Sequence, residues 1–187
     1  MSRIQKLLKD TAVYGISSIL GRALGVVLVP FYAHHLPVND NGVIGVVFAA
    51  FIFLNILYTY GLESAYLKFA SGKEGRINAN LVFSTATLML IISSMAFSLT
   101  MSAFPNITSN LITLNPQWQH LVFYMAAIVL LDTMSALPYA ELRLSNRPYR
   151  FAAVRLSNIL LNLVLNVFFI AYLKLGITGV FIANVLA

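Results

Sequence analysis

Five apolar stretches, each long enough to cross a membrane, constrain this chain more than any other feature of its sequence. A helix needs about 20 largely apolar residues to cross roughly 30 Å of hydrocarbon. A sixth stretch begins at Gly176 and covers only the last 12 residues, which at about 1.5 Å per residue do not reach across. We therefore predict an all-α integral membrane protein, a single helical domain (1–187) with five complete transmembrane helices plus the start of a sixth. The predicted spans are residues 11–33, 42–67, 81–104, 121–142 and 151–173.

The composition excludes an ordinary water-soluble domain. Hydrophobic residues make up 59% of the 187 residues and charged residues only 10%, whereas a soluble domain has about 25% charged residues. So few charges cannot cover the surface of a globular core of this size. The connectors between the spans are short, apart from an uncharged stretch over residues 105–119, and none of them holds a soluble domain.

The placement of the basic residues predicts the orientation of the chain. A net charge of +6 alone would also fit a nucleic-acid-binding protein. Ten of the twelve Lys and Arg residues, however, lie before the first span or around the second and fourth connectors. By the positive-inside rule, these segments and the N-terminus are cytoplasmic. We therefore predict a multi-pass protein of the inner (cytoplasmic) cell membrane, with no nucleic-acid partner.

The sequence contains no recognisable catalytic or cofactor-binding pattern. It has no Cys, and its three His residues lack the spacing of a metal site. Neither a phosphate-binding loop, a dinucleotide fingerprint nor a zinc-protease motif is present. We therefore expect no enzymatic activity, no cofactor and no metal ion.

Two charged residues, Arg22 and Asp132, lie near the middle of predicted spans. An arginine at that depth costs about 2.5–3.5 kcal/mol on insertion scales, so something must solvate it. Arg22 is either a cationic site that faces an internal cavity or a structural arginine paired with a buried acid. Asp132 either holds a proton or cation or neutralises Arg22, since the two lie at a similar depth.

Polar residues recur every four positions along the second and fifth spans. In the second span, Asn55 is followed two turns later by Glu63, which is either solvated at the cytoplasmic end or paired with Lys68. The fifth span carries Arg155 and then three asparagines, whose amides need hydrogen-bond partners. If these faces turn inward, the bundle encloses a hydrophilic cleft whose arginines favour an anionic passenger. The candidate substrate-binding residues are Arg22, Asn55, Glu63, Asp132, Arg155, Asn158, Asn162 and Asn166.

Several short segments carry a family resemblance. They are residues 8–15 (LKDTAVYG), 20–25 (LGRALG), 29–32 (VPFY), 60–69 (YGLESAYLKF), 137–143 (LPYAELR) and 146–148 (NRP), with the asparagine-rich fifth span leading to 176–179 (GITG). Together they resemble the first, second, fourth and fifth helices of the polysaccharide flippases (O-antigen or exopolysaccharide, Wzx-type). These form a branch of the MATE-like exporter superfamily.

The resemblance implies both a fold and a function. Such flippases have about 12 to 14 helices in two lobes around a cavity, and this chain resembles the N-terminal lobe, ending within helix six. They move an undecaprenyl-diphosphate-linked oligosaccharide across the cytoplasmic membrane by alternating access, during the biosynthesis of surface polysaccharides such as lipopolysaccharide. The implied partners are this lipid-linked oligosaccharide, membrane lipids, and the polymerase machinery or a C-terminal lobe. The resemblance also implies that Arg22 meets the diphosphate.

Two other functions stay open. A cation-coupled multidrug antiporter of the same superfamily would use Asp132 as its proton or sodium site. A truncated, non-transporting membrane scaffold would use the polar faces only to bind partner helices.

Overall fold

The computed structural model describes residues 3–72, 78–113 and 116–187; the side chain of Arg22 lies outside the described part. Within these residues the secondary structure is entirely helical, without a β-strand. Five of the described helices are long and apolar enough to cross a membrane, which confirms the predicted all-α, polytopic membrane fold. These spans are Thr11–His35, Val38–Thr59, Ala79–Ala103, Gln119–Leu144 and Pro148–Tyr172.

Large apolar side chains lie on the outer surfaces of these helices. Val26 and Phe53 are each 74% exposed, and Leu99 is 67% exposed. A protein in water rarely exposes so many large apolar groups together. Such surfaces are instead stable against lipid, as expected for spanning helices.

The chain divides into two compact units, where the sequence leads us to expect one helical domain. Unit 1 is Met1–Val38 with Leu142–Ala187, and unit 2 is Asn39–Glu141. Unit 1 contains α1 (Arg3–His35), α8 (Pro148–Val167), the π-helix η2 (Phe168–Tyr172) and α9 (Gly176–Leu186). Unit 2 contains nearly all of α2 (Val38–Thr59) and α7 (Gln119–Leu144), with α3 (Leu62–Ser71), α5 (Ala79–Ala103), α6 (Pro105–Thr113) and η1 (Pro116–Trp118) between them.

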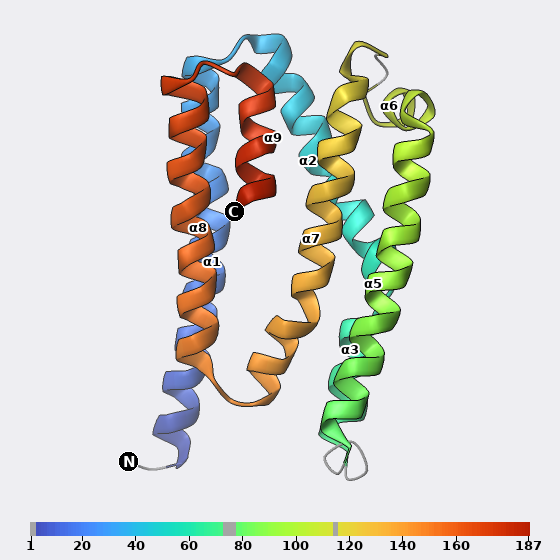
Figure 1. Ribbon diagram of the computed structural model, residues 1–187. Coiled ribbons are helices and arrows are strands. Elements are labelled where there is room, and N and C mark those ends of the chain that lie inside the picture. The colour runs from blue at the N-terminus through green and yellow to red at the C-terminus, as the bar shows by residue number, and fades with distance from the viewer. Residues whose placement is uncertain (1–2, 73–77, 114–115) are drawn as a thin grey trace. The chain divides into compact units, whose positions relative to one another are not determined.

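In unit 1, α1 and α8 pack along each other in the same direction (Figure 1). Near one end, the Tyr14 ring lies edge-on against Phe151, with 5.2 Å between ring centroids. Near the other end, the Tyr32 hydroxyl donates to Asn166 Oδ1 over 2.7 Å. Because the contacts follow the same order along both helices, the pair is parallel.

A tight turn reverses the chain after α8. The π-helical turn ends α8, and Lys174 and Gly176 then take positive φ angles of 52° and 59°. The chain returns as α9 beside α8, with the α carbon of Gly179 close to Phe169, where a Cβ would be 3.1 Å away. The helix begins at Gly176, where the sequence predicts the start of a sixth segment.

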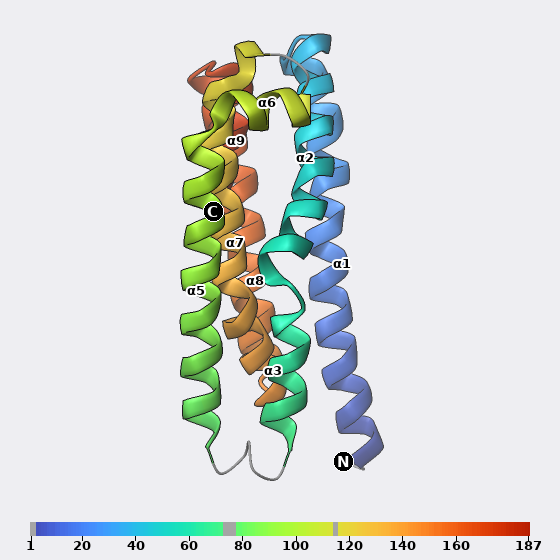
Figure 2. The ribbon, with the colours of Figure 1, turned by 90° about the vertical axis from the view of Figure 1, so that its right-hand side faces the viewer.

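In unit 2, the second predicted span is broken. The sequence predicts one segment over residues 42–67, whereas α2 ends at Thr59 and α3 begins at Leu62. Tyr60 and Gly61 between them have positive φ angles of 34° and 78°, which are incompatible with a continuous right-handed helix (Figure 2). Glycine adopts this conformation without a steric penalty, so Gly61 permits the break.

Hydrogen bonds between helices stabilise the core of unit 2. Tyr58 of α2 is 1% exposed, and its hydroxyl lies 3.2 Å from Oγ of Ser98 on α5. The Ser98 hydroxyl in turn donates to the carbonyl oxygen of Ala126 on α7 over 3.2 Å. Tyr66 of α3 donates to the carboxylate of Glu141 on α7.

The stretch over residues 105–119, which the sequence analysis treats as a connector, contains the short helix α6.

Candidate functional site

The two units differ sharply in charge. Unit 1 has nine Lys or Arg residues and one Asp, a net charge of +8, whereas unit 2 has three basic and five acidic residues, a net charge of −2. Residues 11–38 and 142–187 contain no Asp or Glu at all. The membrane spans of unit 1, Thr11–His35 and Pro148–Tyr172, therefore contain basic residues but no acidic residue that could neutralise them.

Arg155 lies at the contact between α8 and α1. Its side chain is half-buried, and its guanidinium carbon lies 5.9 Å from the centroid of the Phe151 ring. On the α1 side, a Cβ at Gly21 would lie 3.3 Å from Nε and 3.4 Å from Nη2 of Arg155. The absence of a side chain at Gly21 thus leaves room for the guanidinium against α1.

Arg22, the position to which the resemblance assigns the diphosphate contact, follows Gly21 on α1. Its side chain lies outside the described residues, so its predicted role stays a prediction. The backbone nevertheless brings two arginine positions, 22 and 155, to the same level of the α1–α8 pair.

The asparagines of α8 form a hydrogen-bonded network across three helices of unit 1. Asn166 is fully buried; it accepts from Tyr32 and donates to Asn162 Oδ1 over 2.9 Å. The Asn162 amide donates to Asn184 Oδ1 on α9 over 3.2 Å, and exposed Asn158 donates to the backbone oxygen of the last residue. Partners within the protein thus supply hydrogen bonds to these amides, and lining a sugar path stays a prediction for them.

Asp132 and Asn55 are brought together in unit 2. The side chains of Asp132 on α7 and Asn55 on α2 lie close enough to interact. The Asn55 amide also lies 3.1 Å from the carbonyl oxygen of Phe51, one turn earlier. Asp132 is exposed on the surface of its unit. Its described partner is an amide, and its pairing with Arg22 stays a prediction.

Glu63 lies in the first turn of α3, directly after the break at Gly61. A carboxylate at this position interacts favourably with the positive end of the helix dipole. Its side chain is half-buried, whereas that of Lys68 is exposed. Pairing of Glu63 with Lys68 stays a prediction.

Several residues of these networks are not among the sequence candidates. They are Tyr32, Tyr58, Tyr66, Ser98, Glu141 and Asn184. One available signal was Asn184, an amide in a mostly apolar segment, since a half-buried amide needs a hydrogen-bond partner. Tyrosines are also typical of the aromatic belt at the membrane interface, so their presence in the sequence does not predict these hydrogen bonds.

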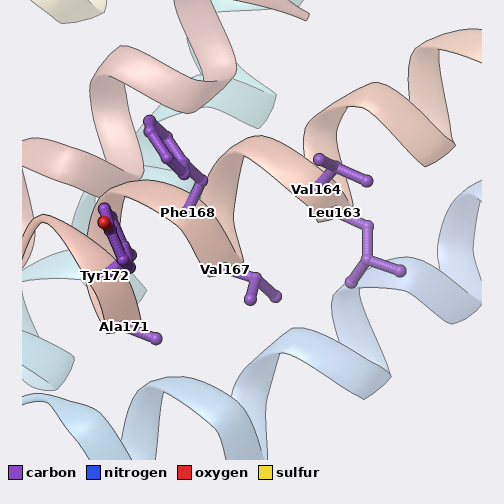
Figure 3. Close-up of a pocket in the computed structure, with 6 residues that line it drawn as sticks. All are labelled: Leu163, Val164, Val167, Phe168, Ala171 and Tyr172. Atoms are coloured by element: carbon purple, nitrogen blue, oxygen red, sulfur yellow. The ribbon is translucent and has the colours of Figure 1, made fainter.

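An open groove runs along α8 and η2 (Figure 3). Phe168 and Tyr172 stack along it with 5.6 Å between ring centroids. Apart from the Tyr172 hydroxyl, the lining side chains offer only apolar surface, which suits lipid chains and gives no polar group to orient a water-soluble ligand. The lining residues are Leu163, Val164, Val167, Phe168, Ala171 and Tyr172.

No group of three or more His, Cys, Asp or Glu side chains that could hold a metal ion occurs among the described residues. A comparison of the chain with family models, curated proteins and solved structures finds no match.

Proposed function

We propose that the chain belongs to a membrane flippase that translocates an undecaprenyl-diphosphate-linked oligosaccharide across the cytoplasmic membrane by alternating access. The observation that carries the proposal is the position of Arg155. Its guanidinium lies against α1 at Gly21, and the spans Thr11–His35 and Pro148–Tyr172 that carry these two residues contain no Asp or Glu. An anionic group from a ligand would complete this site.

A diphosphate fits the chemistry of the α1–α8 pair. A guanidinium offers two parallel N–H donors to phosphate oxygens, and hydrogen bonds between charged groups are roughly twice as strong as neutral ones. The family resemblance assigns a diphosphate contact to Arg22 as well, which follows Gly21 in the sequence. The surrounding apolar surfaces would accept the polyprenyl chain of the same substrate.

Transport by the full chain in proteoliposomes tests this function. The probe is a fluorescent undecaprenyl-diphosphate oligosaccharide whose outer-leaflet fraction is bleached by an impermeant reductant. We expect transport above that of empty liposomes, and at least about a tenfold slower rate for Arg155→Gln, because its bidentate contact is lost. Lys174→Gln removes one exposed positive charge from the same unit and serves as the matched control.

Equal rates for protein-containing and empty liposomes would contradict the proposal. So would an unchanged rate for Arg155→Gln. An equal loss of rate in Arg155→Gln and Lys174→Gln would show that net charge alone matters, and would contradict the assignment of Arg155.

A second candidate function, a cation-coupled antiporter, is supported by the pairing of Asp132 with Asn55. This carboxylate lies within a spanning helix, where an ionisable residue commonly marks an ion or proton path. Drug efflux that Asp132→Asn abolishes and Arg155→Gln leaves intact would favour this function over the flippase.

A further inference from the structure

One end of unit 1 carries a cluster of exposed arginines, which we call the arginine patch. It consists of Arg143 in the last turn of α7, Arg147 at the N-cap of α8, and Arg150 in the first turn of α8. All three side chains are exposed. The patch is separate from Arg155, which is half-buried against α1.

The turn that carries the patch has a defined geometry. The N–H of Arg147 donates to the carbonyl oxygen of Leu142 over 3.0 Å, and the N–H of Asn146 donates to that of Arg143 over 3.1 Å. Asn146 has a φ of 51°. These two bonds with a left-handed residue form the Schellman motif that ends many helices. The motif holds the backbones of Arg143 and Arg147 close together.

Contacts with Tyr14 fix this turn beside the N-terminal half of α1. The Tyr14 hydroxyl donates to the carbonyl oxygen of Leu142 over 3.4 Å, and the Tyr14 ring packs against Phe151. Figure 1 shows the start of α1 and the α7–α8 turn at the same end of the unit. Three further basic positions and one acidic position, Asp10, precede Tyr14 in the sequence of α1. The basic positions are Arg3, Lys6 and Lys9.

The patch lies where spanning helices reach the membrane surface. The span of α7 ends at Leu144 and that of α8 begins at Pro148, so Arg147 lies between two spans. Phospholipid headgroups occupy this depth. Tyr149, 58% exposed beside the patch, is the kind of aromatic residue that anchors helices at the headgroup level.

The positive-inside rule explains why basic residues gather on one side, but it does not distinguish Lys from Arg. At this turn every basic residue is Arg, and no acidic residue occurs between Leu142 and Ala187. Guanidinium groups bind phosphate through two parallel hydrogen bonds, which the ammonium group of Lys cannot do. The turn therefore offers phosphate-binding groups, and no carboxylate follows it in the sequence. The carboxylate that precedes it, Glu141, accepts a hydrogen bond from Tyr66.

We propose that the arginine patch binds the headgroups of anionic phospholipids at the membrane surface. The phosphate oxygens accept hydrogen bonds from the exposed guanidinium groups, while the acyl chains lie along the apolar faces of the adjacent helices. Anionic lipids are favoured over zwitterionic ones because the zwitterionic headgroup brings its own positive charge to a surface that is already basic. The site does not depend on the transport activity proposed above.

Lipid binding to the purified full chain in detergent tests the site. The probes are short-chain phosphatidylglycerol and short-chain phosphatidylcholine, titrated at low salt. We expect the wild type to prefer phosphatidylglycerol. The double variant Arg147→Gln/Arg150→Gln should bind it at least about tenfold more weakly, since each basic residue near an anionic surface contributes roughly fivefold.

The matched control is Lys68→Gln/Lys174→Gln, which removes the same charge from two exposed positions outside the patch. This control should keep the preference for phosphatidylglycerol, and a thermal unfolding curve for each variant confirms that it is folded. Three results would overturn the proposal: no preference in the wild type, an equal loss in both double variants, or full retention in Arg147→Gln/Arg150→Gln.

A further titration distinguishes a phospholipid headgroup from a free diphosphate as the ligand of the arginine patch. Inorganic pyrophosphate is titrated against the same proteins. If pyrophosphate binds more tightly than phosphatidylglycerol and loses its affinity in Arg147→Gln/Arg150→Gln, the patch is a diphosphate site and the lipid assignment is overturned. Weaker binding of pyrophosphate supports the lipid assignment.

Discussion

Gly21 shows how a single residue shapes the α1–α8 contact. The Nε atom of Arg155 would lie 3.3 Å from a Cβ at this position, which is closer than ordinary van der Waals contact. Gly25, one turn later on the same helix, has nothing within 4 Å of such a Cβ. The two glycines, one turn apart on α1, therefore have different environments, and only Gly21 lies next to the guanidinium of Arg155.

This difference predicts different outcomes for the same substitution. Gly25→Ala should stabilise the protein by about 0.5–1 kcal/mol, because alanine loses less backbone entropy in a helix than glycine. Gly21→Ala should gain less, because Arg155 must shift to accommodate the methyl group. Thermal unfolding in detergent measures both. An equal gain in both variants would show that Arg155 does not contact α1 at this level.

The break between α2 and α3 is the clearest feature at the scale of elements. Hydropathy continues across it, so the periodicity of the segment gives no sign of an interruption. The conformations of Tyr60 and Gly61 are backbone properties, and only the glycine indicates where such a break is tolerated. The apolar spans could thus be predicted from the sequence, whereas the discontinuity in the second span could not.

Gly61→Ala should destabilise the protein by about 1–2 kcal/mol, because a Cβ is strained at a φ of 78°. Gly45→Ala in α2 is the matched control, since a Cβ there meets nothing within 4 Å and its φ is not positive. The measurement is again thermal unfolding. A stability for Gly61→Ala at or above that of Gly45→Ala would argue for a continuous helix.

The spacing of the asparagines on α8 predicts which face of the helix is polar, but it does not identify their hydrogen-bond partners. The four-residue spacing of the asparagines indicates one polar face, and the burial of Asn162 and Asn166 agrees with that. The partners Tyr32 and Asn184 come from helices distant in sequence, so spacing alone cannot identify them. A single sequence therefore predicts the face and not the contacts.

The Tyr32–Asn166 hydrogen bond can be measured by a double-mutant cycle. Tyr32→Phe, Asn166→Ala and the double variant should show a coupling free energy of about 0.6 kcal/mol, and at most about 1.7 kcal/mol, the average and the maximum for hydrogen bonds between membrane helices. Tyr32→Phe combined with Asn158→Ala provides the control, because Asn158 contacts the last residue instead. Additive effects of Tyr32→Phe and Asn166→Ala would contradict the bond.

At the scale of the whole molecule, charge is distributed unevenly. Unit 1 carries a net charge of +8 and unit 2 a net charge of −2, and the total of +6 for the chain does not show this difference. The sequence records each charge, but only the fold assigns residues 1–38 and 142–187 to one unit. The location of a basic unit could therefore not be predicted without the structure.

The predicted orientation can be tested on the whole protein because the chain has no Cys. Val38→Cys and Ser145→Cys each place one thiol at an exposed position near opposite ends of the spans in unit 1. A membrane-impermeant maleimide added to intact cells should label the first and not the second, because the N-terminus is expected to be cytoplasmic. Labelling of Ser145→Cys alone would reverse the orientation.

The central proposal is that Arg155, within membrane spans that contain no acidic residue, binds a lipid-linked diphosphate at the α1–α8 pair. The most direct measurement is the equilibrium binding of farnesyl diphosphate and of farnesol to the detergent-purified chain and to Arg155→Gln. Hydrogen bonds to charged groups contribute about 1.5–3 kcal/mol, so the diphosphate should bind roughly 10- to 100-fold more tightly than the alcohol. Most of that preference should disappear in Arg155→Gln and persist in Lys174→Gln. Equal affinity of the wild type for farnesyl diphosphate and farnesol would contradict the claim.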